Sequence, residues 1–129
     1  MSKVLGTRKD IAYTERLAVR IIMKNDKDEI VIIFVKNGNY YKLPGGGIEP
    51  DEDHRFAGER KAMEETGCKV IMDEGCMATT EEWRNDLHQI SYYYRAHLVR
   101  DTGVVELTED EIVDGLQHGW ISVKSAMRG

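Results

Sequence analysis

The residues from Pro44 to Cys68 decide the fold of this chain, and they read PGGGIEPDEDHRFAGERKAMEETGC. The three glycines after the proline let the backbone turn sharply and let main-chain groups approach a ligand. The run from Asp53 to Thr66 favours a helix, and Gly67 is the residue type that commonly ends one. The stretch therefore predicts a strand end, a glycine loop and a helix in direct succession.

The segments on either side of this stretch favour β-strands. Ile30 to Val35 is a continuous apolar run, which is typical of a strand buried on both faces. Other strands are expected at residues 17–23, 40–43, 70–72, 90–99 and 120–123. Residues 1–14 read as an irregular or loosely paired lead-in, 108–116 as a loop or one helical turn, and 125–127 as the opening of a helix. The expected core positions of the main helix are Phe56, Ala57, Ala62 and Met63. This order indicates a mixed α/β fold with helices on the two faces of a sheet.

The size and charge of the chain limit the classes of function. Its 129 residues suit one compact domain. The formal net charge of −5 disfavours general DNA or RNA binding, which normally requires a basic face. It is compatible with binding a small polyanion if a metal ion supplies positive charge. No apolar run approaches the roughly 18 residues needed to cross a membrane, so neither nucleic acid nor a membrane is expected as a partner.

The two cysteines, Cys68 and Cys76, do not form a metal-binding pattern. They are not spaced as CxxC and no paired histidine lies close by, so two free thiols in a reducing cytosol are expected. The start of the chain lacks the apolar core of a secretory signal. A cytoplasmic location is therefore predicted.

Two adjacent carboxylates, Glu64 and Glu65, lie near the end of the expected helix. Arg60 precedes Glu64 by four residues, so the two share a helix face and can pair. Neighbouring carboxylates repel each other unless a cation lies between them. Mg²⁺ or Mn²⁺ is the usual solution, because it takes oxygen ligands and bridges to phosphates. For a lone Glu-Glu pair, a solvated acidic helix face is the commoner explanation, as a tight turn without a ligand is for a glycine triplet.

The spacing of these residues favours a functional site over a solvated helix face and a ligand-free turn. It resembles the Nudix box, whose pattern is G-x5-E-x7-R-E-U-x-E-E-x-G-U with U apolar. Eight of the nine specified positions match, and they are Gly46, Glu52, Arg60, Ala62, Glu64, Glu65, Gly67 and Cys68. The chain is therefore identified as a member of the Nudix (MutT-like) hydrolase family. Residues 1–129 are expected to form a single Nudix domain, with a C-terminal helix that is short or truncated.

The resemblance implies an α/β/α sandwich with a mixed β-sheet, in which the box forms a loop–helix–loop. It also implies hydrolysis of a diphosphate bond in a nucleotide-type small molecule, with Mg²⁺ or Mn²⁺ as cofactor. By resemblance, Arg60, Glu64 and Glu65 are the catalytic residues. The Gly45 carbonyl and the two carboxylates would ligate the metal, Arg60 would hold those carboxylates in place, and Glu52 would brace the loop. The structural positions of the box are Gly46, Glu52 and Gly67.

Lys61 departs from the family pattern, which has at this position a glutamate that ligates metal or acts as general base. The ammonium can pair with Glu65 and compete directly with a cation. Glu59 is a poor replacement, because two residues correspond to about 200° around a helix. We therefore expect weaker metal binding and slower hydrolysis than in a complete box, or none. In this family a further acidic ligand often comes from the loop before the last strand. Glu111 is the first choice there and Glu109 the second, with a solvated acidic loop as the alternative.

The sequence indicates the residues that contact substrate less clearly than it indicates the metal-binding residues. Candidates for stacking a base are Tyr40, Tyr41 and Trp83, and candidates for meeting a phosphate are Lys36 and Lys42. Ordinary sheet packing and surface lysines are the commoner explanations. The histidines show no ligand spacing and read as surface or edge residues; they are His54, His88, His97 and His118.

Two functions remain open at this point. The leading one is a Mg²⁺-dependent pyrophosphohydrolase that cleaves a nucleoside diphosphate derivative or a nucleoside triphosphate. The alternative is a Nudix-fold module that binds a nucleotide or a partner protein and hydrolyses little, because Lys61 blocks the metal site. The oligomeric state is also open, with a homodimer as one option.

Overall fold

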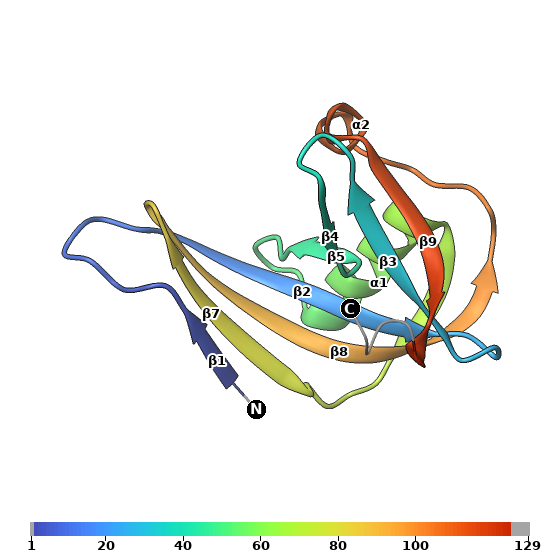
Figure 1. The fold of residues 1–129 in the computed structure, drawn as a ribbon. Helices are drawn as coiled ribbons and strands as arrows, with labels where there is room; N and C mark the ends of the chain where they lie inside the picture. Colours follow the sequence, from blue (N-terminus) through green and yellow to red (C-terminus); the bar gives the residue numbers. More distant parts are fainter. Residues whose placement is uncertain (1, 125–129) are drawn as a thin grey trace.

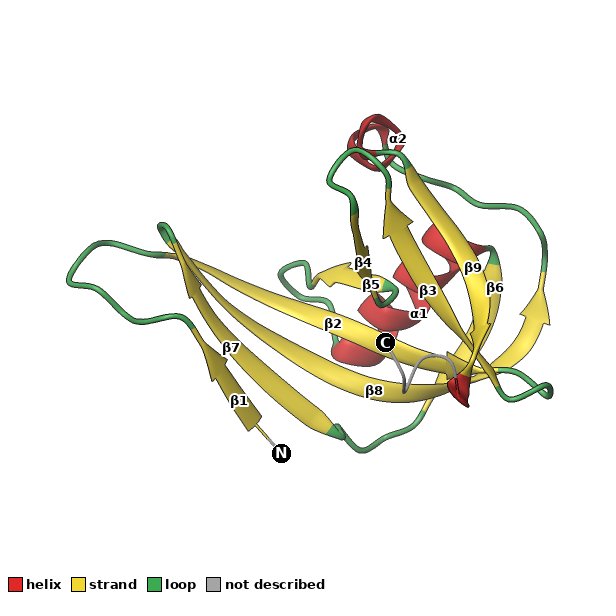
Figure 2. Cartoon of the chain, in the orientation of Figure 1, coloured by secondary structure: helices red, strands yellow, loops and turns green. Residues whose placement is uncertain are grey.

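The computed structural model describes residues 2–124 of the chain. One nine-stranded sheet runs through this part of the molecule (Figures 1 and 2). Its strands are β1 (Ser2–Leu5), β2 (Thr14–Lys24), β3 (Glu29–Val35), β4 (Tyr40–Lys42), β5 (Gly45–Gly47), β6 (Cys68–Met72), β7 (Ala78–Arg84), β8 (Leu87–Asp101) and β9 (Leu116–Ser122). The accompanying helices are α1 (His54–Thr66) and α2 (Glu109–Asp114). The strand order is β1-β7-β8-β2-β3-β4, with β5 paired to β2, β6 to β8 and β9 to β3.

The long strands β2 and β8 tie the two ends of the molecule together. They pair in parallel from Thr14 opposite Leu87 to Lys24 opposite His97. β1 also runs parallel to β7, whereas the other pairs are antiparallel, so the sheet is mixed. In Figure 1, β1 and β7 flank the first halves of β2 and β8, and β3, β4 and β9 lie toward the other end. These observations confirm the predicted α/β fold with a mixed sheet.

The hydrophobic core lies between the sheet and α1. Its members from β2 and β3 are Val19, Ile21, Met23, Val31, Ile33 and Val35. The helix contributes small side chains, of which Ala57 and Ala62 are fully buried. A Cβ at Gly58 would collide with the sulfur of Met72 on β6. Small residues thus let α1 approach the sheet closely, and this packing fixes the helix face that carries the acidic residues.

The ends of α1 are defined by capping groups. The Asp53 side chain accepts a hydrogen bond from the Phe56 N–H at 2.7 Å, which satisfies one of the free donors of the first turn. Gly67 has φ +73°, and its N–H donates to the Met63 carbonyl. A left-handed glycine is the common way to end a helix, so the helix and its end glycine are confirmed as predicted.

Most predicted strands are present, with bounds that differ by a few residues. The expected core of α1 was half right: Phe56 is 62% exposed and Met63 is only partly buried. Phe56 lies on the outward face of the first helical turn, whereas its neighbour Ala57 faces the sheet and is fully buried. β3 is less enclosed than expected, because it alternates between buried and partly buried positions. Residues 108–116 contain α2, a short helix with a capping box between Thr108 and Glu111.

The largest omission is β7, a strand in a segment that reads as a polar connection. Its sequence is ATTEEWR, in which charged residues outnumber apolar ones. It pairs with β8 on one side and with β1 on the other, so the lead-in is partly a strand. Backbone pairing on both edges stabilises this segment, and that signal is not visible in side-chain patterning.

Two further predictions concern the end of the chain and the two cysteines. The helix expected at residues 125–127 lies outside the described residues. Both cysteines are free, Cys68 buried and Cys76 exposed, as predicted. No helix in the described part of the chain is long and apolar enough to cross a membrane.

Candidate active site

Glu65 is anchored beneath the glycine loop. Glu65 is only 2% exposed, and its Oε1 accepts a hydrogen bond from the Gly45 N–H at 2.9 Å. Gly45 has φ +141°, a conformation that side chains rarely adopt, and a Cβ there would collide with the Val19 carbonyl oxygen. Only glycine fits this position, so the loop sequence directly holds a carboxylate of α1 in place.

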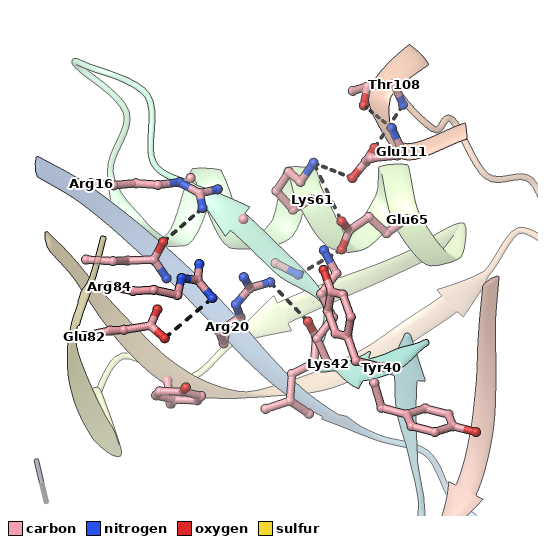
Figure 3. Close-up of a pocket in the computed structure, with 17 residues that line it drawn as sticks. Arg16, Arg20, Tyr40, Lys42, Lys61, Glu65, Glu82, Arg84, Thr108 and Glu111 are labelled. Atoms are coloured by element: carbon pink, nitrogen blue, oxygen red, sulfur yellow. Dashed lines mark hydrogen bonds and ion pairs between the residues drawn. The ribbon is translucent and has the colours of Figure 1, made fainter. Parts of the chain in front are cut away.

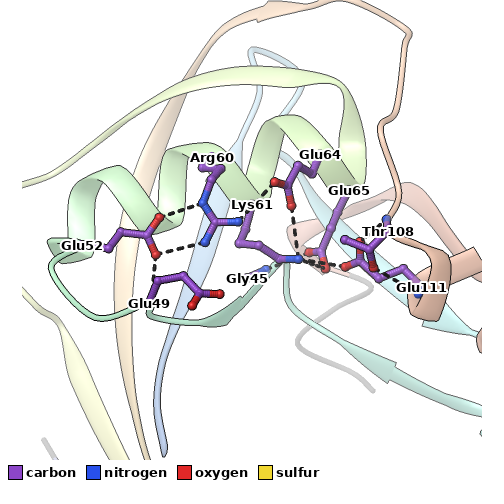
Figure 4. Close-up of polar contacts among 9 residues, drawn as sticks. All are labelled: Gly45, Glu49, Glu52, Arg60, Lys61, Glu64, Glu65, Thr108 and Glu111. Carbon is purple, nitrogen blue, oxygen red and sulfur yellow. Dashed lines mark hydrogen bonds and ion pairs between the residues drawn. The ribbon is translucent and has the colours of Figure 1, made fainter.

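Arg60 forms a clamp between the loop and the helix (Figure 4). Its Nε and Nη2 donate to the two oxygens of Glu52 at 2.7 and 3.0 Å, and its Nη1 donates to Glu64 Oε1 at 3.1 Å. Glu52 also accepts from the Glu49 N–H, which ties the loop together. The hydrogen bond from Arg60 holds the pKa of Glu52 below its usual value. This geometry agrees with the expected bracing by Glu52 and orientation of Glu64 by Arg60.

Lys61 places its ammonium among three carboxylates (Figure 4). Its Nζ lies 2.9 Å from Glu111 Oε2, 3.3 Å from Glu64 Oε2 and 3.8 Å from Glu65 Oε2. Burial opposes the charged form, but the hydrogen bond to Glu111 and the neighbouring carboxylates raise the pKa of Lys61 above its usual value. The expected pairing with Glu65 is present, and the ammonium also engages the two other acids.

The glycine loop makes room for the stem of Lys61. A Cβ on Gly46 would lie 2.9 Å from Lys61 Cε, closer than packed carbon atoms approach. The Lys61 side chain therefore lies against the loop, and only 12% of this side chain is exposed. The absence of a side chain at position 46 is what allows Lys61 to reach the acidic cluster.

Two carboxylate oxygens of this cluster lack hydrogen bonds. Within the described residues, Glu64 Oε2 and Glu65 Oε2 are the buried side-chain oxygens or nitrogens without a hydrogen-bond partner. Each lies within ion-pair distance of Lys61 Nζ, but without the geometry of a hydrogen bond. Buried carboxylate oxygens of this kind are acceptors for a cation.

The pKa values of Glu65 and Glu111 are shifted in opposite directions from their usual value. Burial raises the pKa of Glu65 to about 7, and the neighbouring Glu111 adds to the shift. Burial also works against ionisation of Glu111, but contacts with Glu65, the Thr108 N–H and Lys61 lower its pKa to about 2. Burial and the contacts within the cluster therefore shift the pKa values of these two carboxyl groups apart.

The acidic cluster opens into a pocket of about 740 Å³ (Figure 3). Its charged lining residues are the cations Arg16, Arg20, Lys42, Lys61 and Arg84 and the acids Glu65, Glu82 and Glu111. The remaining lining residues are Tyr40, Tyr41, Leu43, the three loop glycines, Gln89, Tyr93 and Thr108. The pocket thus has five cations and three carboxylates, although the whole chain has a formal charge of −5.

Several pocket residues were missed from the sequence. Arg16 and Arg20 lie on the same face of β2, because side chains at alternate positions of a strand point the same way. Arg84 ends β7, the strand that the sequence did not reveal. Alternation along residues 16–20 was the available signal, but arginines in a strand are more often ordinary surface residues.

Other predicted residues divide between the pocket and elsewhere. Tyr40, Tyr41 and Lys42 line the pocket, as does Glu111, whereas Lys36, Trp83 and Glu109 do not. Glu59 accepts a hydrogen bond from the Met72 N–H, away from the acidic cluster, as its helix position predicts. Trp83 instead packs against Tyr13 and stacks on His88 at 3.7 Å between ring centroids. The expectation for His88 was wrong, since its side chain is 12% exposed and bridges Glu15 and Glu81.

Comparison with known proteins agrees with this geometry. Residues 14–129 match the family model of the NUDIX domain. The chain is 27% identical over 119 residues to diphosphoinositol polyphosphate phosphohydrolase 3-beta of Bos taurus, which covers 90% of this chain and 68% of that protein. It is equally similar to diphosphoinositol polyphosphate phosphohydrolase 2 of Rattus norvegicus, where the match spans 62% of the relative's length.

Solved structures show the same fold. The MutT protein from Methanosarcina mazei Go1 superposes with a TM-score of 0.72 at 17% identity, over 93% of this chain and 86% of that one. A NUDIX-family hydrolase from Clostridium perfringens gives a TM-score of 0.69 at 17% identity, over 88% and 85%. These likenesses confirm the fold, and the family model matched over residues 14–129 shows that the chain belongs to the Nudix hydrolase family.

Proposed function

We propose that this protein hydrolyses a diphosphate bond in a small, multiply phosphorylated molecule, with Mg²⁺ or Mn²⁺ as cofactor. One observation carries the proposal: the two buried oxygens of Glu64 and Glu65 that lack hydrogen-bond partners lie beside a pocket with five cations. Such oxygens suit a cation, and such a pocket suits phosphate groups. The curated relatives act, by their names, on diphosphoinositol polyphosphates.

The donor set fits a hard divalent cation in its chemistry, since such ions take carboxylate and carbonyl oxygens. The residues that would hold it are Glu64 and Glu65, with Glu111 and the Gly45 carbonyl. As these side chains stand, the described residues contain no group of three acidic, histidine or cysteine side chains arranged to hold a metal. Lys61 lies in the middle of the cluster, so its flexible side chain has to swing out before a cation can enter.

The chain's own residues supply orientation and charge. Arg60 fixes the Glu64 carboxylate and the Gly45 N–H fixes that of Glu65, so neither rotates freely. On the opposite side of the pocket, Arg20 and Lys42 can hold phosphate oxygens. A divalent cation, when bound, neutralises phosphate charge and lowers the pKa of the attacking water.

The substrate class follows from the charge of the pocket. Five cations favour a ligand that carries anionic groups beyond the diphosphate that is cut. Nucleoside triphosphates, nucleoside diphosphate derivatives and diphosphoinositol polyphosphates all meet this requirement. Tyr40 and Tyr41 line the same pocket and offer rings on which a base can stack.

A second candidate function is favoured by the position of Lys61. An ammonium within 3.8 Å of all three acids repels a divalent cation and partly replaces it. The protein would then bind a nucleotide-like ligand or a partner protein and turn over little.

One assay separates the two functions. Wild type, Lys61→Glu, Glu64→Gln and Glu65→Gln are incubated with MgCl₂ and a panel of nucleoside triphosphates, nucleoside diphosphate derivatives and diphosphoinositol polyphosphates, and the cleavage products are separated and quantified by ion-exchange chromatography. Turnover by wild type that either glutamine substitution abolishes supports the hydrolase. An inert wild type with an active Lys61→Glu variant supports the binding module.

A further inference from the structure

We propose that the pocket binds a diphosphate-type anion directly through Arg20, Lys42 and Lys61, without a divalent cation. The inference concerns the same pocket as the proposed function, but it requires neither a metal nor turnover. Three observations support it: the excess of cations in the pocket, the absence of a carboxylate within ion-pair distance of Arg20 and Lys42 in the described residues, and the position of Lys61.

Arg20 is a mostly enclosed guanidinium with little to balance it. Its Nη1 donates to the Leu43 carbonyl at 3.3 Å. Across residues 2–124, no carboxylate oxygen lies within ion-pair distance of it. Burial lowers the pKa of Arg20, and the charge of Glu65 only partly offsets this effect. Because a guanidinium has five N–H donors and stays protonated, the remaining donors are available to an anion in the pocket.

Lys42 is in the same situation on β4. It is partly buried and lines the pocket, yet none of the ion pairs found in the described chain involves it. Burial lowers the pKa of Lys42 and the charge of Arg20 adds to that effect, while the charge of Glu65 partly offsets it. Figure 3 shows Lys42 and Arg20 together on the side of the pocket that faces the helix. A partly buried cation without an acid at ion-pair distance is costly, and an anion bound between these two would reduce that cost.

Lys61 completes the cationic lining from the helix side. Its ammonium lies 2.9 Å from Glu111, and Lys61 lines the pocket together with Glu65 and Glu111 (Figure 3). An ammonium has three N–H donors, and Glu111 is the one group to which Lys61 donates a hydrogen bond in the described residues. It thus supplies at this position part of the positive charge that a metal would otherwise supply.

The acids of the pocket oppose an anion less than their number indicates. Glu65 and Glu111 are both within 3.8 Å of Lys61 Nζ, and Glu82 lies 3.8 Å from Arg84. Each acid of the pocket therefore has a cation at ion-pair distance, whereas within the described residues no carboxylate lies that close to Arg20 or Lys42, and Glu65 only partly compensates their charges. The net positive charge of the pocket is concentrated where a phosphate can reach it.

The test uses inorganic pyrophosphate as the probe and calorimetric titration in EDTA as the readout. Wild type is expected to bind without added metal. Lys42→Gln and Arg20→Gln are each expected to weaken binding about tenfold or more, since each removes a charge-assisted contact. The matched control is Lys36→Gln, which removes an exposed lysine outside the pocket and should change the affinity less than about twofold. Near-ultraviolet circular dichroism checks that each variant is folded.

Two results would overturn the inference: binding that requires added Mg²⁺, or a loss in Lys36→Gln as large as that in Lys42→Gln. The outcome is separable from that of the proposed function. Binding in EDTA by a protein that hydrolyses none of the panel would reject the hydrolase and leave the metal-free site intact. Mg²⁺-dependent hydrolysis without binding in EDTA would reject the metal-free site alone.

Discussion

The two walls of the pocket balance their charges in different ways. On the α1 wall, Arg60 pairs with Glu52 and Glu64, and Lys61 pairs with the remaining acids of the cluster. On the β2–β4 wall, Arg20 and Lys42 have no such partner among residues 2–124. A single lysine at a position where the family pattern has a glutamate thus partly neutralises the wall that would hold a metal. The opposite wall is left with two cations that have no ion pair in the described residues and that Glu65 only partly compensates, so substitutions in the two walls are expected to have different effects.

The largest effect is expected from breaking the α1 wall at Glu65. Under the proposed function, Glu65→Gln lowers kcat about 100-fold or more, because even groups that only support metal ligands cost about 10–100-fold. The steady-state rate at which the cleavage products form with MgCl₂ measures the loss. Glu109→Gln, a change in an acid outside the pocket, serves as the control and should retain activity. Equal activity of Glu65→Gln and wild type would refute the assigned role.

A smaller effect is expected from loosening the arginine clamp. Arg60→Lys keeps the charge but cannot contact Glu52 through two nitrogens and Glu64 through a third. We expect a loss of about 1–3 kcal/mol in the free energy of unfolding, because the partly buried Glu52 loses charge-assisted hydrogen bonds. Urea denaturation measures it, with Arg55→Lys on the same helix as the control. Unchanged stability in Arg60→Lys would mean that the clamp contributes little.

A change at Gly46 sharpens the comparison without altering any charge. In Gly46→Ala, the new Cβ would press on Lys61 Cε and displace the ammonium from the acids. Affinity for Mn²⁺ should rise about threefold to tenfold, since a nearby positive charge is moved away. Gly47→Ala is the matched control, because its Cβ would meet Arg16 instead. Paramagnetic titration with Mn²⁺ gives both affinities, and an equal rise in the two variants would contradict the role assigned to Lys61.

The smallest effect is expected far from both walls, at His88. Burial opposes its charged form, but hydrogen bonds to Glu81 and Glu15 raise the pKa of His88 above its usual value. Its stabilising contribution is therefore complete below the unfolded pKa of about 6.5 and is lost as the pH rises through the folded pKa. The Tm difference between wild type and His88→Gln should shrink from about pH 5 to about pH 9. A difference that stays constant over this range would show that ionisation of His88 does not matter.

The fold was predictable where local patterns agree with tertiary structure. The helix after the glycine loop has a capping aspartate, an end glycine and small buried residues, and each of these is visible in the sequence. β7 was not predictable, because its stability comes from pairing with β8 and β1 rather than from apolar side chains. Phe56 was misjudged for a related reason: an aromatic residue on a helix is expected inside, but its position in the first turn points outward.

The site was predictable along α1 and not across the pocket. The spacing of Arg60, Glu64 and Glu65 along the sequence was enough to predict that they lie together on α1. The charge of Lys61 was enough to predict its contact with Glu65. The contribution of Arg16, Arg20 and Arg84 depends on how distant strands pair, which no local pattern specifies. The balance between the two walls, on which the metal-free site rests, is therefore visible only in the folded chain.

The central claim is that the Lys61 ammonium occupies the space in which a divalent cation would bind. Mn²⁺ affinity of wild type and of Lys61→Glu, measured by titration under identical conditions, tests it most directly. Lys61→Glu is expected to bind Mn²⁺ at least about tenfold more tightly, because two units of charge change beside the ion. Equal affinity in the two proteins would contradict the claim.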